Sequence, residues 1–237
     1  MAHRKADKAA LRRERERREA EARAAQERKR MVGYGAAGAL AIAAIAVVVF
    51  LAAGDGSSAG GQGGGDVFPE GGDVAEQTQF DMNAAAKAAD CELKDNPGRA
   101  RTHTTSLDEK VPYKENPPNS GRHFQTPAED GLYYEAPPDE MLVHAQEHGR
   151  VVVWVKPRLP AEARKTIRAL FDEDEYQMLV VPRANMPYAV AASAWSRDPA
   201  PNGTGRTLGC DRWNDKIVDA IRTFRDEHRS NGPEPVP

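Results

Sequence analysis

Residues 139–155 read DEMLVHAQEHGRVVVWV, and this stretch carries a helix, a stop signal and a strand in direct succession. Pro138 and Asp139 open a short helix, and Gly149 follows its last turn, where glycine commonly ends a helix. The unbroken apolar run of Val151–Val155 is typical of a buried strand. The stretch therefore predicts a short helix followed at once by a buried strand.

Two more helices and two more strands follow along the chain. Pro160 starts a helix whose apolar residues recur at helical spacing, namely Ala163, Ile167, Leu170 and Phe171. Residues 178–181 and 188–195 predict strands, and Asp211 is expected to cap a closing helix. The order β-α-β-β-α predicts an α+β fold, with a small mixed sheet of one parallel crossover pair, one antiparallel pair and packed helices. A thioredoxin-like or a ferredoxin-like core would accommodate this order.

The flanks of this core are less regular. Residues 81–90, DMNAAAKAAD, predict a short helix, whereas the turn-forming residues of 97–138 predict a long, irregular but ordered segment. Residues 230–237, SNGPEPVP, predict a disordered tail. We therefore expect the folded body to span residues 67–229.

An apolar run precedes the body. Met31–Ala53 comprises 23 residues without a charge. As a helix rising ~1.5 Å per residue it would be about 34 Å long, enough to cross ~30 Å of hydrocarbon. Residues 54–66, seven of which are glycine, predict a flexible linker to the body. A cleavable signal peptide is the alternative, because residues 51–54, LAAG, resemble a cleavage site.

Charge orients this predicted transmembrane helix. Residues 1–30 hold 12 Lys and Arg against 6 acids, and no Lys or Arg follows the apolar run until Lys87. By the positive-inside rule the basic tail stays in the cytoplasm and the C-terminal body is exported. We therefore expect a single-pass protein of the plasma membrane with an extracytoplasmic domain. The acids interleaved in the tail suit contact with anionic lipid headgroups better than with nucleic acid.

The two cysteines, Cys91 and Cys210, both lie in the body. An oxidising compartment favours a disulfide between them, which would close a loop of about 120 residues and hold the N-terminal helix to the C-terminal one. Two unpaired buried thiols, or a cysteine acting as a soft metal ligand, are the alternatives. The absence of Cys-x-x-Cys argues against thioredoxin chemistry.

Histidines carry the main chemical signal. Four of the six fall within 46 residues: His103, His123, His144 and His148. His144 and His148 lie one turn apart on one helix face, a spacing that lets two imidazoles bind one metal ion. His103 and His123 lie in the irregular segment that must fold back over this helix. Neutral imidazole binds zinc and copper, so all four are candidate ligands. Imidazoles that only satisfy backbone groups are the alternative.

The same helix matches a sharper pattern. Residues 144–148 read HAQEH, the H-x-x-E-H pattern of inverted zinc peptidases, in which Glu147 would be the catalytic general base. The pattern is short enough to arise by chance, and Gly149 ends the helix where the peptidase motif needs it to continue. Motifs for nucleotide binding and for serine hydrolases are absent from the sequence, so we expect no nucleotide cofactor.

Two uncommon motifs occur in order, with residues 116–123 reading NPPNSGRH and residues 142–149 reading LVHAQEHG. Over about residues 90–228 the chain resembles a domain-of-unknown-function family of single-span, exported proteins common in actinobacteria. The resemblance implies that His123, His144, Glu147 and His148 share one site, with His103 as a further candidate, and it supplies no activity. Gln146 stands where an apolar residue would be expected.

A physical account fits the first motif. Pro117-Pro118 stiffens the approach, and residues 119–121 make a tight turn that presents His123. Ser120 is placed to hydrogen-bond a ring nitrogen of His123 and set its tautomer. The sequence therefore predicts an exported domain that binds a transition metal, zinc or copper. A zinc hydrolase and a metal-free domain that docks an envelope protein through its proline-rich loop are the alternatives.

Overall fold

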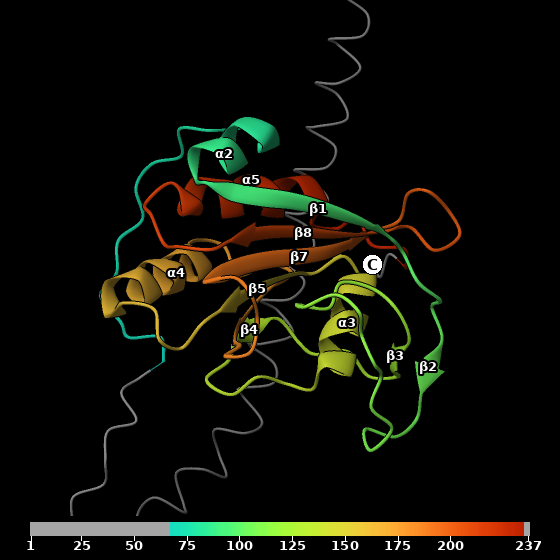
Figure 1. The fold of residues 1–237 in the computed structure, drawn as a ribbon. Coiled ribbons are helices and arrows are strands. Elements are labelled where there is room, and N and C mark those ends of the chain that lie inside the picture. The colour runs from blue at the N-terminus through green and yellow to red at the C-terminus, as the bar shows by residue number, and fades with distance from the viewer. Residues whose placement is uncertain (1–66, 235–237) are drawn as a thin grey trace, which may run out of the picture. The chain divides into compact units, whose positions relative to one another are not determined.

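One mixed six-stranded sheet with helices on both faces organises residues 67–234, the part of the chain that the computed structural model describes (Figure 1). Its elements in chain order are α2 (Met82–Ala88), β1 (Cys91–Pro97), β2 (His103–Thr104), β3 (His123–Phe124), β4 (Gly131–Leu132), α3 (Asp139–Glu147), β5 (Val151–Val155), α4 (Ala161–Glu173), β6 (Met178–Pro182), β7 (Val190–Ser196), β8 (Thr204–Cys210) and α5 (Ile217–His228).

The predicted transmembrane helix, the basic tail and the glycine-rich linker lie outside the described residues. Among residues 67–234, no helix combines the length and the hydrophobicity that crossing a bilayer requires.

The sheet has the strand order β1-β8-β7-β5-β6-β4. β5 and β6 are parallel and connected through α4, which confirms the predicted crossover pair, and β7 pairs antiparallel with β5. The sequence did not predict β1 and β8, which pair antiparallel along seven residues at one edge. Their sequences, CELKDNP and TGRTLGC, are mostly polar or small and lack the apolar run that marks β5. Pairing with neighbours, rather than strand propensity, makes them strands.

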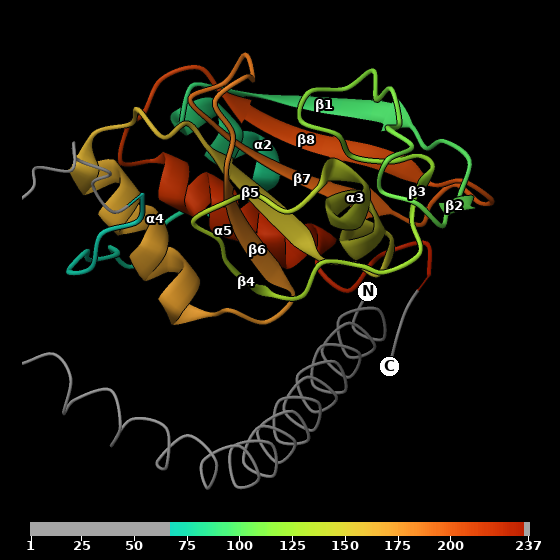
Figure 2. The same cartoon turned by 90° about the horizontal axis from the view of Figure 1, so that it is seen from below.

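Each face of the sheet has its own hydrophobic core. On one face, α2, α4 and α5 pack against β5–β8, and the four apolar residues predicted for α4 are buried there. On the other face, Leu142 and Ala145 of α3 pack against residues of β5 and β6. Figure 2 shows α3 in front of the strands and α5 behind them. The face that α3 covers is the one on which the candidate site is built.

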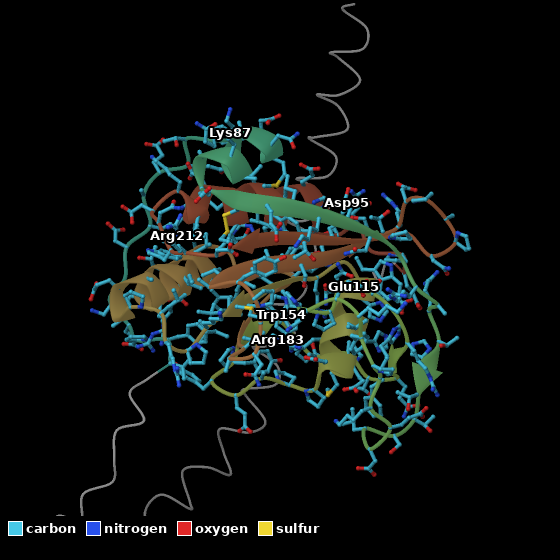
Figure 3. All side chains as sticks on the ribbon, in the orientation of Figure 1. Lys87, Asp95, Glu115, Trp154, Arg183 and Arg212 are labelled. Carbon is cyan, nitrogen blue, oxygen red and sulfur yellow. A yellow bond between two sulfur atoms is a disulfide. The ribbon has the colours of Figure 1, made fainter. Side chains whose placement is uncertain are left out.

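An arginine fixes the start of α3. The guanidinium of Arg183, which follows β6, donates two hydrogen bonds to the carboxylate of Asp139, at 2.6 and 3.0 Å. The same guanidinium lies over the ring of Trp154, 5.1 Å from its centroid (Figure 3). The bidentate pair and the stacking together hold the first residue of the helix against the sheet.

The predicted disulfide between Cys91 and Cys210 is present. The two residues are direct partners in the β1–β8 register, so the bond joins two neighbouring strands. Cys91 begins β1 shortly after α2 ends, and Cys210 ends β8 shortly before α5 begins. The bond therefore also ties the N-terminal helix to the C-terminal one, as expected, and these two helices pack together. The bond also removes either cysteine as a metal ligand.

Two boundaries differ from the sequence prediction. Helix α5 begins at Ile217, and Asp211 does not cap it. Asn214 makes the first turn instead, since its side-chain oxygen accepts from Lys216 N at 3.0 Å and its carbonyl accepts from Ile217 N at 3.1 Å. At the C-terminus, residues 230–234 are hydrogen-bonded to the end of α3 and the turn after it, as Ser230 N donates to Gly149 O at 2.9 Å and Glu234 N to Glu147 O at 3.0 Å.

Candidate metal centre

Three short segments bring four candidate residues together. β2 and β3 form a parallel pair in which His103 lies opposite His123. β3 in turn lies beside α3 (Figure 1), which carries His144 and Glu147. The ring centroids of His103, His123 and His144 are 4.6 to 5.0 Å from one another. One ligand atom from each histidine and one from Glu147 all lie within 4.8 Å of each other.

A backbone carbonyl orients each of the buried imidazoles. Nδ1 of His123 lies 2.8 Å from the carbonyl oxygen of Gly121, and Nδ1 of His144 lies 2.6 Å from that of Phe124. A carbonyl oxygen can only accept, so Nδ1 carries the hydrogen in both rings. Nε2 of each ring therefore presents its lone pair in the neutral form. This is the orientation that metal-binding histidines receive from the groups behind them.

The expected role of Ser120 was wrong. Its hydroxyl oxygen is buried and has no hydrogen-bond partner among the described residues, and the carbonyl of the next residue, Gly121, holds the His123 ring instead. The carbonyl oxygen of Gly121 is positioned by the main chain, so no side-chain rotamer has to be fixed for it to reach Nδ1. The turn can therefore orient His123 without a hydrogen bond from Ser120.

Glu147 is fully buried and divides its two oxygens between two partners. Oε1 accepts a hydrogen bond of 2.6 Å from Nε of Arg101. Oε2 lies 3.0 Å from Nε2 of His123. That contact lacks the alignment of a hydrogen bond, and both atoms are buried without any hydrogen-bond partner. Two buried acceptors that face each other are costly unless a proton or a metal ion lies between them.

The electrostatic surroundings favour the protonation states of Glu147 and His144 that can bind a cation. Burial alone would raise the pKa of Glu147, but the interactions with His123 and Arg101 outweigh it and bring this pKa to about 2. Burial, and then the nearby His123, lower the pKa of His144 to about 4. At neutral pH Glu147 is therefore a carboxylate and His144 a neutral imidazole, which are the forms that bind metal ions.

His148 lies beside this group but is not part of it. Its ring centroid is 4.6 Å from that of His144, as the helical spacing predicted. Its Nδ1, however, donates to the carbonyl oxygen of Glu234 at 3.0 Å, so that the ring ties the C-terminal segment to the end of α3. Glu147, the candidate general base of the peptidase pattern, lies among the potential ligands.

Two residues around the site were not identified from the sequence. Arg101 lies two residues before His103. Side chains two residues apart in an extended strand lie on the same face, and this spacing is the only signal in the sequence that points to Arg101. Gln146 is fully buried and donates from Nε2 to the carbonyl oxygen of Pro118 at 3.2 Å. The glutamine thereby ties the proline-rich loop to α3, which explains a polar residue at an apolar position.

The donor set is of a kind that binds transition-metal ions in other proteins. Three imidazole nitrogens and one carboxylate oxygen suit zinc, copper(II) and similar divalent ions. In a tetrahedral zinc site, with bonds of about 2.0–2.1 Å, neighbouring ligand atoms are ~3.3 Å apart. The 3.0 Å between His123 Nε2 and Glu147 Oε2 is close to this value. The His/Glu group, whose ligand atoms all lie within 4.8 Å of one another, could therefore hold a metal ion if the other ligand atoms move closer together.

Comparison with known proteins identifies the family. No curated protein and no solved structure matches the chain. A family model described as "Protein of unknown function (DUF3105)" matches residues 104–237, more than half of the chain. The matched segment contains His123, His144, Glu147 and His148, whereas Arg101 and His103 precede it. The chain therefore belongs to the DUF3105 family of proteins of unknown function.

Proposed function

We propose that this protein binds one divalent transition-metal ion through His103, His123, His144 and Glu147. The observation that carries the proposal is the buried contact of 3.0 Å between His123 Nε2 and Glu147 Oε2, two atoms without a hydrogen-bond partner. A proton between them would satisfy only this pair. A metal ion would also engage the lone pair of His144 and the ring of His103, which lie within reach of the same point.

The chemistry of the donor atoms limits which metal ions the site would bind. Both cysteines are in the disulfide, so no thiolate contributes to the site. Imidazole nitrogen and carboxylate oxygen favour zinc or copper(II) over copper(I), which prefers sulfur ligands. The proposed cargo or cofactor is therefore a divalent ion of this kind.

The proposed place of action is the outer side of the plasma membrane. The uncharged run Met31–Ala53 and the Lys and Arg residues before it support a single membrane span with the domain exported. A disulfide within the domain is typical of proteins exposed to an oxidising compartment. We therefore propose metal binding or handling at the cell envelope, with the basic tail against anionic lipid headgroups.

Zinc-dependent hydrolysis with Glu147 as the base is less well supported. A general base works best with a pKa near the working pH, whereas the pKa of Glu147 is about 2. Its Oε1 is already held by Arg101, and its Oε2 faces another candidate ligand. A carboxylate in this position is better suited to bind a cation than to take a proton from water.

The test is the metal content of the purified full-length chain, measured by mass spectrometry, together with titration of the chelator-treated protein with zinc and copper(II). We expect one ion per chain in the wild type, and loss of that ion in His144→Ala. His228→Phe is the matched control, because His228 is a buried histidine of α5 outside the group. Near-ultraviolet circular dichroism checks that each variant is folded.

The absence of any metal from the wild type, even after zinc and copper(II) are added, would refute the proposal. The cluster would then have a structural role or form a docking surface for an envelope protein.

A further inference from the structure

Arg101 holds one oxygen of the carboxylate that faces the candidate metal position. Its Nε donates to Oε1 of Glu147 at 2.6 Å, and its side chain is 31% exposed, whereas that of Glu147 is 0% exposed. On its outer side, Nη2 of Arg101 lies 3.5 Å from Oε2 of Glu234. The guanidinium is thus fixed between one buried and one exposed carboxylate.

We infer that Arg101 is a positioning residue that restricts Glu147 to a single metal–oxygen bond and thereby holds the centre four-coordinate. The inference rests on the metal binding proposed above. A free carboxylate can bind a metal ion through one oxygen or through both. With Oε1 engaged by the guanidinium, only Oε2 remains, and it faces Nε2 of His123. Groups behind a ligand commonly set its orientation in this way.

The number of metal ligands in the site depends on whether Glu147 binds through one oxygen or two. His103, His123 and His144 offer three nitrogens, and Glu147 with one free oxygen offers a fourth donor. Four nitrogen and oxygen ligands suit the tetrahedral preference of zinc, whereas manganese and similar ions prefer six. Release of Oε1 would add a fifth donor from within the site. Arg101 therefore determines metal specificity without binding the metal itself.

The main chain around Arg101 is held independently of its side chain. His123 N donates to the carbonyl oxygen of Thr102 at 3.0 Å, and Gln125 N donates to that of Thr104 at 3.1 Å. These bonds belong to the β2–β3 pair and do not involve the guanidinium. A substitution at position 101 should therefore leave His103 in place and alter only the carboxylate.

Cobalt(II) provides the test, because its visible absorption is strongest in four-coordinate centres, weaker in five-coordinate centres and weakest in six-coordinate centres. The full-length chain, freed of metal, is titrated with cobalt(II) as wild type, Arg101→Met and Arg101→Lys. Arg212→Met is the matched control, since Arg212 lies away from α3 (Figure 3), its side chain is 85% exposed and it pairs with Asp90.

We expect strong visible absorption in the wild type and in Arg212→Met, and a several-fold loss of intensity per bound ion in Arg101→Met. Arg101→Lys should keep most of the intensity, because an ammonium group can still donate to Oε1. Competition between zinc and manganese should shift towards manganese in Arg101→Met alone.

An Arg101→Met spectrum that matches the wild type at full occupancy would overturn the inference while metal binding stands. Weak absorption in the cobalt-loaded wild type would overturn it as well. A wild type that takes up no cobalt, zinc or copper(II) would refute the proposed function, and the role of Arg101 with it.

Discussion

Substitution of His228 by phenylalanine should remove a large part of the acid sensitivity of the domain. His228 is the last residue of α5, only 8% exposed, and its ring packs edge-to-face against Phe224 with a centroid separation of 4.5 Å. Burial, reinforced by the positive charge of Arg206, lowers the pKa of His228 from 6.5 to about 4. Phenylalanine retains a ring at this position and cannot take up a proton.

The sign and the size of the effect follow from proton linkage. Between pH 6.5 and about pH 4 the unfolded chain binds a proton at His228 and the folded chain does not. Stability therefore falls as the pH falls through this window. A pKa of about 4 instead of 6.5 corresponds to a loss of about 3 kcal/mol at ~1.36 kcal/mol per pH unit. This loss is a large share of the ~5–15 kcal/mol by which domains are stable.

The assay is urea unfolding of residues 67–237, which contain both hydrophobic cores and the disulfide, followed through tryptophan fluorescence. Wild type and His228→Phe are compared at about pH 7.5 and about pH 4. The wild type should lose about 3 kcal/mol more than the variant between these two conditions. Other titrating groups, His144 included, remain in both proteins and cancel. Equal losses in the two proteins would show that folded His228 accepts a proton as readily as the unfolded chain, and would refute the reasoning.

Three further predictions concern the disulfide, Gly149 and Leu142, which stabilise the fold around the site. Replacement of Cys91 and Cys210 by serine opens a loop with a sequence separation of 119 residues, so the free energy of unfolding should fall by about 4–5 kcal/mol, measured with urea. Gly149 has φ +86°, and a Cβ there would lie 2.9 Å from Cα of Ser230, so Gly149→Ala should lower stability by about 1–3 kcal/mol in thermal unfolding. Leu142 of α3 is 0% exposed and packs against the sheet. Leu142→Ala should cost about 2–5 kcal/mol and weaken metal binding in the same titrations, and unchanged affinity would show that α3 keeps its place without this contact.

Local patterns were sufficient for the elements that carry strong apolar signals. Val151–Val155 is a buried strand, α3 ends before Gly149 as predicted, and the apolar residues of α4 face the core. The disulfide also followed from the presence of just two cysteines in a domain expected to be exported. β1 and β8 carry no such signal, because their residues become strand only through pairing with each other and with β7.

For the candidate site, the sequence by itself determined that His144, Glu147 and His148 share one face of a helix, because the period of the α-helix places residues three and four apart side by side. It could not determine which of them point into a common space with His103 and His123, because those two arrive on strands of only two residues. The tertiary structure decided that Glu147 joins the histidines, that His148 turns to the C-terminal segment and that Arg101 holds the carboxylate. The last two of these contacts join residues 86 and 46 positions apart, and only the packing of the whole domain brings such residues within hydrogen-bond distance.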